Sequence, residues 1–231
     1  MKLTDANRPM RVLDKVLHGG LGAGNLGVIM ARHGTGKLAV LTSIAIDHAM
    51  DSRNTLHVAL GQTLSDIRAY HDEVLHGIAG SLDLNNNELQ TLVERHKQIY
   101  NFRDGQFNLA RLRETLDFLR DGCEFVPELI EFQGWPDFEK LDPNEMEQLK
   151  AVAKEYNCEM WLAAHTHRTD TVSDAGLPDF IARQQDQLSA VVSLEPEAEH
   201  VRIHVLKAND AAAAEQIHLE FDPQSMLIRW R

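Results

Sequence analysis

Residues 31–38 read Ala-Arg-His-Gly-Thr-Gly-Lys-Leu and join two apolar segments. Residues 26–31 form a short apolar run typical of a buried strand, and residues 37–50 predict a helix that is apolar on most of its faces. A strand, a glycine-containing loop and a helix in direct succession are typical of a sheet with parallel strands and helical connections. This segment constrains the fold more than any other part of the sequence.

The loop matches most of the phosphate-binding motif G-x-x-x-x-G-K-[ST]. In that motif backbone N–H groups surround phosphate oxygens, the lysine reaches the β and γ phosphates, and the hydroxyl ligates magnesium. Gly36 and Lys37 satisfy the motif. Ala31 replaces its first glycine and Leu38 replaces its hydroxyl residue, so we expect a phosphate cradle without that magnesium ligand. The predicted binding residues are His33, Gly34, Thr35, Gly36, Lys37 and Leu38.

Composition limits the function classes. The chain has 231 residues, of which 43% are hydrophobic and 25% charged, so residues 1–231 are expected to form a single domain. A formal net charge of −12 disfavours nucleic-acid binding. The only cysteines, Cys123 and Cys158, lack metal-site spacing and are interpreted as two semi-buried thiols in a reducing compartment. Neither an export signal nor a membrane span is expected, and we predict a cytoplasmic protein.

Strand and helix patterns alternate along most of the chain. Further strands are expected at residues 55–60, 99–102, 125–132 and 160–164, with 125–132 as the central strand. Helices are expected from a cap at Thr63 or Ser65 to residue 78, near residues 88–96, over 109–119, and from a cap at Asp142 to residue 156. Residues 80–87 are interpreted as a loop. Four C-terminal strands linked by hairpins are predicted at residues 190–194, 201–206, 217–221 and 226–230.

Several segments together resemble one family. Residues 13–20 read Leu-Asp-Lys-Val-Leu-His-Gly-Gly and lead through residues 24–26 into the loop. This entry is similar to that of the RecA-like ATPase core of circadian-clock KaiC proteins and bacterial replicative DnaB-type helicases. Residues 149–168 resemble the helix and strand that precede the family's γ-phosphate-sensing loop. The resemblance implies an α/β, three-layer RecA-like P-loop NTPase fold, with a mainly parallel central sheet flanked by helices and with C-terminal antiparallel strands.

The chain departs from that family at the positions that carry its chemistry. The resemblance puts Gly61 where the family has a catalytic glutamate and Gln133 where it has the magnesium-directed aspartate. A register shift that uses Glu131 instead is an alternative. His165 falls at the sensing position, and Asn209 falls where an arginine reaches a neighbouring subunit's nucleotide.

These replacements predict a catalytically inactive or severely impaired protein, with no catalytic residue. Loss of an arginine finger alone lowers the rate by about 10³–10⁵, and magnesium neutralises much of the remaining charge. We therefore interpret the chain as a pseudo-ATPase, not an enzyme, that acts through protein contacts and binds ATP, ADP or another phosphorylated ligand weakly and without magnesium. One alternative is a structural remnant whose lysine faces solvent or pairs with a carboxylate. The other is a divergent ATP-binding protein or ATPase that acts as a nucleotide sensor, using Lys37 with Glu131 or His165.

The remaining features leave alternatives open. His165 and His167 are interpreted as sensor-loop residues in preference to a metal pair, and no metal site is predicted. Residues 168–176 are expected to be a solvated loop without nucleic-acid contacts. Trp135 is either an exposed anchor for a partner or a cover over the sheet. We expect a protein partner or self-association, and no contact with a membrane. A monomer, a dimer and a ring are all alternatives for the oligomeric state.

Overall fold

The computed structural model describes residues 8–103, 105–167, 169–173, 176–209 and 218–230. Within these ranges nine strands form one sheet in the order β3-β2-β4-β5-β1-β6-β7-β8-β9. The strands are β1 (Leu26–Ala31), β2 (Thr55–Leu60), β3 (Lys97–Phe102), β4 (Leu129–Gln133), β5 (Glu159–His165), β6 (Leu188–Pro196), β7 (Val201–Ala208), β8 (Leu219–Asp222) and β9 (Leu227–Trp230). The pairs from β3 to β6 are parallel, and those from β6 to β9 are antiparallel. The predicted α/β class, with a mainly parallel sheet and antiparallel C-terminal strands, is confirmed.

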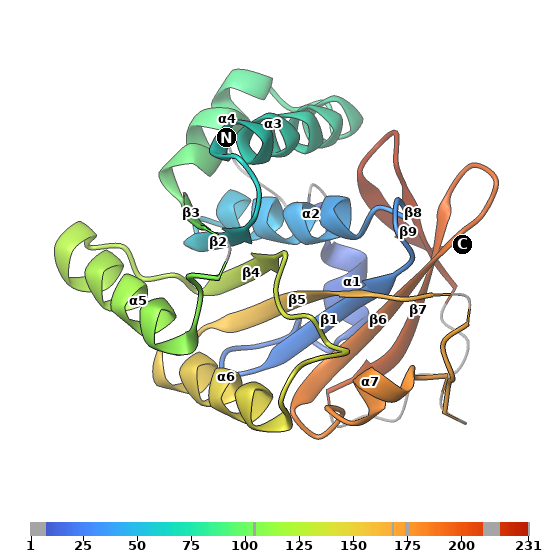
Figure 1. The fold of residues 1–231 in the computed structure, drawn as a ribbon. Helices are drawn as coiled ribbons and strands as arrows, with labels where there is room; N and C mark the ends of the chain where they lie inside the picture. Colours follow the sequence, from blue (N-terminus) through green and yellow to red (C-terminus); the bar gives the residue numbers. More distant parts are fainter. Residues whose placement is uncertain (1–7, 104, 168, 174–175, 210–217, 231) are drawn as a thin grey trace.

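Helices cover both faces of the parallel part of the sheet (Figure 1). The described helices are α1 (Arg11–Val16), α2 (Lys37–Met50), α3 (Leu64–Ser81), α4 (Asn86–Arg95), α5 (Leu109–Cys123), α6 (Pro143–Glu155) and α7 (Asp179–Ala182). In Figure 1, α2, α3 and α4 lie above the sheet, α6 lies below it, and α5 lies to its left. This arrangement has three layers. No described helix has both the length and the apolar character needed to cross a lipid bilayer.

Side-chain alternation divides the strand residues between the two helical layers. Leu56 and Val58 of β2, with Ile130 and Phe132 of β4, belong to the core that packs against α5 and α6. Because successive strand residues point to opposite faces, the residues between them face the layer of α2 and α3. Polar side chains on that second face are thus enclosed between sheet and helices.

The predicted central strand is the main topological error. The middle strand of the nine is β1, whereas β4 lies between β2 and β5. The strand also begins at Leu129, where its pairing with Thr55 starts, and not at residue 125. Pro127 has no N–H to donate to a ladder, which disfavours an earlier start.

Smaller differences concern ends of helices and the thiols. The expected loop at 80–87 is shorter, because α3 continues to Ser81 and Asn85 caps α4. The side chains of Thr63 and Asp142 cap α3 and α6 as predicted. The two cysteines are not alike: Cys123 is exposed and Cys158 is buried. Residue 217, the start of one predicted strand, lies outside the described residues.

Candidate phosphate-binding site

The loop that joins β1 to α2 combines left-handed glycines with an uncapped helix start. Gly34 and Gly36 have φ angles of 77° and 95°, a left-handed conformation that glycine adopts without steric cost. None of the described side chains caps α2, so no side chain in the described part of the chain accepts a hydrogen bond from the first N–H groups of this 14-residue helix. Partial positive charge at a helix N-terminus favours anions there.

Ala31 does not disturb this geometry. It is the last residue of β1 and pairs in register with His165 and Leu194 on the two neighbouring strands. Its backbone is therefore extended, and its methyl group is buried. The first glycine of the motif is not needed where the strand itself supplies this position.

The ammonium group of Lys37 lies on the loop. Its Nζ donates to the carbonyl oxygens of Ala31 at 2.7 Å and Arg32 at 3.1 Å. It also lies 3.3 Å from Nδ1 of His165. Burial lowers the pKa of Lys37 below its usual range. The lysine thus neither extends into solvent nor is seen to pair with a carboxylate among the described residues.

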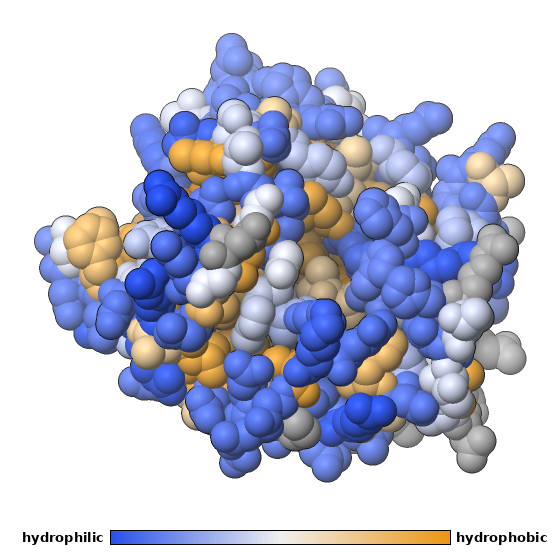
Figure 2. Space-filling view, in the orientation of Figure 1, coloured by the Kyte–Doolittle hydropathy of each residue, from blue (hydrophilic) through white to orange (hydrophobic). Residues whose placement is uncertain are grey.

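A cavity of about 880 Å³ opens beside this loop, at the carboxyl ends of β1, β4 and β5. Figure 2 shows pale and hydrophobic residues gathered in a central hollow of a largely hydrophilic face. Aromatic side chains make one part of the lining: Tyr70, Phe132, Trp135, Phe138 and Phe180. Open α/β sheets commonly bind ligands in crevices at the carboxyl ends of their strands.

Three histidines line the same cavity. The ring of His165 lies 5.5 Å from that of His33 and 5.0 Å from that of His167, measured between centroids. Burial, the ammonium of Lys37 and the other two imidazoles lower the pKa of His165. With Lys37, this edge of the cavity concentrates groups that carry or can acquire positive charge.

All six predicted binding residues line the cavity, namely His33, Gly34, Thr35, Gly36, Lys37 and Leu38. Leu38 therefore presents an aliphatic side chain where the motif has a magnesium-binding hydroxyl. Gln133 also lines the cavity, but its Oε1 lies 3.1 Å from Nε2 of His57. The carboxylates in the described lining are Asp137, which pairs with Lys140 at 2.7 Å, and Glu139, which lies 3.8 Å from His167.

Other positions singled out in the sequence lie elsewhere. Glu131 is buried and bonds to His57, and it is not among the described residues lining the cavity. Asn209 donates from Nδ2 to the carbonyl oxygen of Leu17 at 2.9 Å, within its own chain. Gly61 is exposed and likewise is not part of the described lining. Arg168 and Asp174 of the expected loop at 168–176 lie outside the described residues.

Trp135 is an element of the cavity wall. It is half-buried, and its ring packs against Phe107 at 4.7 Å and Phe132 at 5.3 Å between centroids. These contacts favour the interpretation of Trp135 as a cover over the sheet and disfavour its interpretation as an exposed anchor for a partner. The aromatic lining was missed by sequence reasoning because it combines β4, the segment after it, α3 and α7, and apolar residues carry no motif that separates a wall from a core.

No family model matches this chain, and no curated protein matches it. The resemblance to RecA-like proteins therefore depends on the residues quoted above.

Proposed function

We propose that this protein is a RecA-like pseudo-ATPase that holds a phosphorylated ligand such as ATP or ADP at residues 33–38, without magnesium and without hydrolysis. It acts through protein contacts. One arrangement supports the proposal: Lys37 and the uncapped start of α2 lie at the same cavity, and Leu38 lines that cavity where the motif has its magnesium-binding hydroxyl residue.

Phosphate binding here needs no metal. Helix N–H groups and a nearby ammonium provide hydrogen bonds and charge for an anion. Because Lys37 is half-buried, an incoming phosphate meets a partly desolvated ammonium, and charge-assisted bonds are stronger in such surroundings. A volume of about 880 Å³ is within the range of small-molecule sites and leaves room for a base against the aromatic wall.

The contacts of Gln133 and Asn209, which replace the family's magnesium-directed aspartate and arginine, disfavour hydrolysis. Gln133 offers a neutral amide oxygen that already contacts His57, so it is a poor substitute for a magnesium-directed carboxylate. Asn209 is engaged with the carbonyl of Leu17 in its own chain, which does not favour a role at a neighbour's nucleotide. Arginine fingers typically contribute about 10³–10⁵ to the rate, and magnesium contributes further charge neutralisation.

Protein contacts are favoured by one edge of the sheet. β3 is an edge strand of the described sheet and leaves one side of its backbone unpaired. Tyr100 of β3 and Phe118 of α5 are 40% and 60% exposed and line one surface hollow. Exposed apolar residues beside an unpaired strand are typical of a docking edge.

Thermal melting in the presence of EDTA tests the ligand half of this proposal. Millimolar ATP should raise the melting temperature, because ligands that bind only the folded state stabilise it. Lys37→Ala should abolish the rise, whereas Lys15→Ala, an exposed lysine on α1, should keep it. A wild-type melting temperature that ATP does not move would contradict the proposal.

A nucleotide-sensing ATPase is the second candidate, and the 3.3 Å approach of His165 to Lys37 favours it. It predicts magnesium-dependent phosphate release that disappears in both Lys37→Ala and His165→Ala. The pseudo-ATPase predicts phosphate release no faster than that of Lys37→Ala protein.

A further inference from the structure

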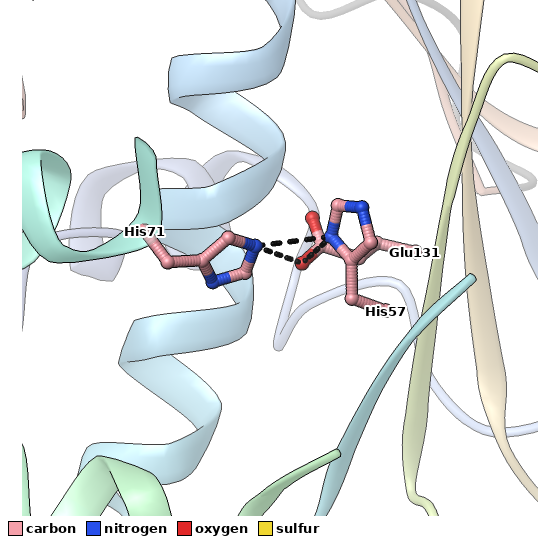
Figure 3. Close-up of side chains that lie close together, drawn as sticks. All are labelled: His57, His71 and Glu131. Atoms are coloured by element: carbon pink, nitrogen blue, oxygen red, sulfur yellow. Dashed lines mark hydrogen bonds and ion pairs between the residues drawn. The ribbon is translucent and has the colours of Figure 1, made fainter. Parts of the chain in front are cut away.

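A cluster of three polar side chains lies on the opposite side of β4 from the main core. His57 of β2 and Glu131 of β4 are register partners, so their side chains stand next to each other on the face that α2 and α3 cover. His71 of α3 points into the same place from the helical layer (Figure 3). Each of the three residues is only 1% exposed. None of them is used by the proposed phosphate site.

Three potential ligand atoms converge in this cluster. Nδ1 of His57 lies 2.8 Å from Oε1 of Glu131 and 3.1 Å from Nε2 of His71, and the latter lies 3.6 Å from Oε1 of Glu131. Zinc bound at about 2.0 Å by tetrahedral nitrogen and oxygen ligands holds those ligands about 3.3 Å apart. The observed distances lie on either side of that value, so small shifts bring all three atoms onto one ion.

The hydrogen-bond pattern favours a positive ion at the centre. Oε1 of Gln133 lies 3.1 Å from Nε2 of His57; when Nε2 donates to this oxygen, a neutral imidazole keeps its lone pair on Nδ1. That lone pair faces Oε1 of Glu131 at 2.8 Å. In that tautomer the two electron-rich atoms repel each other, and either a proton on Nδ1 or a metal cation bound by both atoms removes the repulsion.

Two further atoms of the cluster lack partners. Oε2 of Glu131 and Nδ1 of His71 are buried and form no hydrogen bond with the described residues. A buried carboxylate with an unpaired oxygen is costly, and a divalent cation compensates its charge. With a metal ion on Nδ1 of His57, the side-chain oxygen of Gln133 accepts the hydrogen bond from Nε2, since metal-bound histidines usually donate their other ring N–H to an oxygen.

We infer that His57, His71 and Glu131 bind one divalent transition-metal ion of the zinc class, which ties α3 to β2 and β4. The two histidine nitrogens and the carboxylate supply three ligands, and a water molecule is the expected fourth. This inference does not depend on the proposed phosphate site.

Metal content tests it directly. Untagged protein, stripped with chelator and re-equilibrated with Zn²⁺, should retain one equivalent after gel filtration, measured by elemental analysis. Co²⁺ should give the visible absorption of a tetrahedral complex. Glu131→Gln, which keeps the side-chain shape, should retain no equivalent, and so should His71→Gln. His76→Gln, an exposed histidine on the same helix, should behave as wild type.

Gln133→Met tests the outer partner while leaving all three ligands in place. It should weaken zinc binding by about 10–100-fold, and circular dichroism should confirm that the variant is folded. A zinc equivalent that survives in Glu131→Gln but is lost in His165→Ala or His167→Ala would place the ion among the cavity histidines and overturn the inference. Failure of the wild-type protein to retain zinc would also overturn it.

Discussion

At the scale of single residues, the proposed phosphate loop, residues 31–38, depends on backbone angles as much as on side chains. Gly36 directly precedes the first residue of α2 and has a φ angle of 95°. A Cβ atom there would make only an ordinary van der Waals contact, with the ring of Phe221 at 3.8 Å. The constraint at this position is therefore conformational, whereas Ala31 is tolerated because its backbone is part of β1.

Gly36→Ala should lower the free energy of unfolding by about 1–2 kcal/mol, the cost of a left-handed residue with a Cβ atom. The same change should weaken ATP binding, because the loop N–H groups are displaced. Gly80→Ala is the matched control: Gly80 is in α3 with open space around it, and alanine should stabilise the helix by up to about 1 kcal/mol. Urea unfolding of both variants measures the two changes in the free energy of unfolding. A Gly36→Ala protein as stable as wild type would contradict the predicted backbone strain at position 36.

At the scale of secondary-structure elements, β1 and β5 fit together through one small residue. Gly27 of β1 is the register partner of Trp161 of β5, which is among the largest fully buried side chains. A Cβ atom on Gly27 would lie 2.6 Å from the indole ring. The strand that leads into the phosphate loop is thus positioned by the packing of this tryptophan.

Gly27→Ala should destabilise the protein by about 1–3 kcal/mol, because overpacking forces the indole or the strand to move. The double variant with Trp161→Leu should lose less stability than the two single changes added together, since the smaller side chain removes the clash. Chemical unfolding of all three variants measures this coupling. Additive losses would mean that the two positions do not interact as described.

The contact between α3 and the sheet should depend on pH in metal-free protein. Burial lowers the pKa of His71 from 6.5 to about 3. Between these values the unfolded chain binds a proton that the folded chain does not, so stability is fully present above about pH 6.5 and is lost as the pH falls. This proton uptake by His71 in the unfolded chain should lower the free energy of unfolding by about 1.6 kcal/mol between pH 6.5 and pH 5.

Unfolding in EDTA at several pH values measures that dependence. His71→Phe should flatten the slope, whereas His76→Phe, on the exposed side of α3, should keep it. Equal slopes in wild type and His71→Phe would assign the acid sensitivity to other groups.

At the scale of the whole molecule, the sheet order explains why distant segments share a cavity. The carboxyl ends of β4, β5 and β1 are neighbours, so Gln133, His165 and the loop after Ala31 meet although they are far apart in sequence. Hydrophobic periodicity predicted these three strands and the helices that follow β1 and β4, and the glycine motif indicated the loop after β1. They did not predict that β1 is the middle strand, because strand order is set by tertiary packing.

The histidine and glutamate cluster was missed for a related reason. The sequence indicates Glu131 as a substitute magnesium ligand or as a partner of Lys37 in a divergent ATPase, and neither role places it beside a histidine. His57 and Glu131 alternate with apolar residues on their strands, and this alternation assigns them to the other face. Only the packing of α3 brings His71 to them, which no local pattern in the sequence indicates.

Calorimetric titration of ATP into the wild-type protein, once in EDTA and once in excess Mg²⁺, distinguishes metal-free nucleotide binding from magnesium-dependent hydrolysis. We expect one site per chain with about the same affinity under both conditions, because in the proposed site Lys37 and the loop N–H groups bind phosphate while Leu38 offers no ligand to magnesium. Binding that appears only with Mg²⁺, accompanied by the heat of continuing hydrolysis, would contradict it.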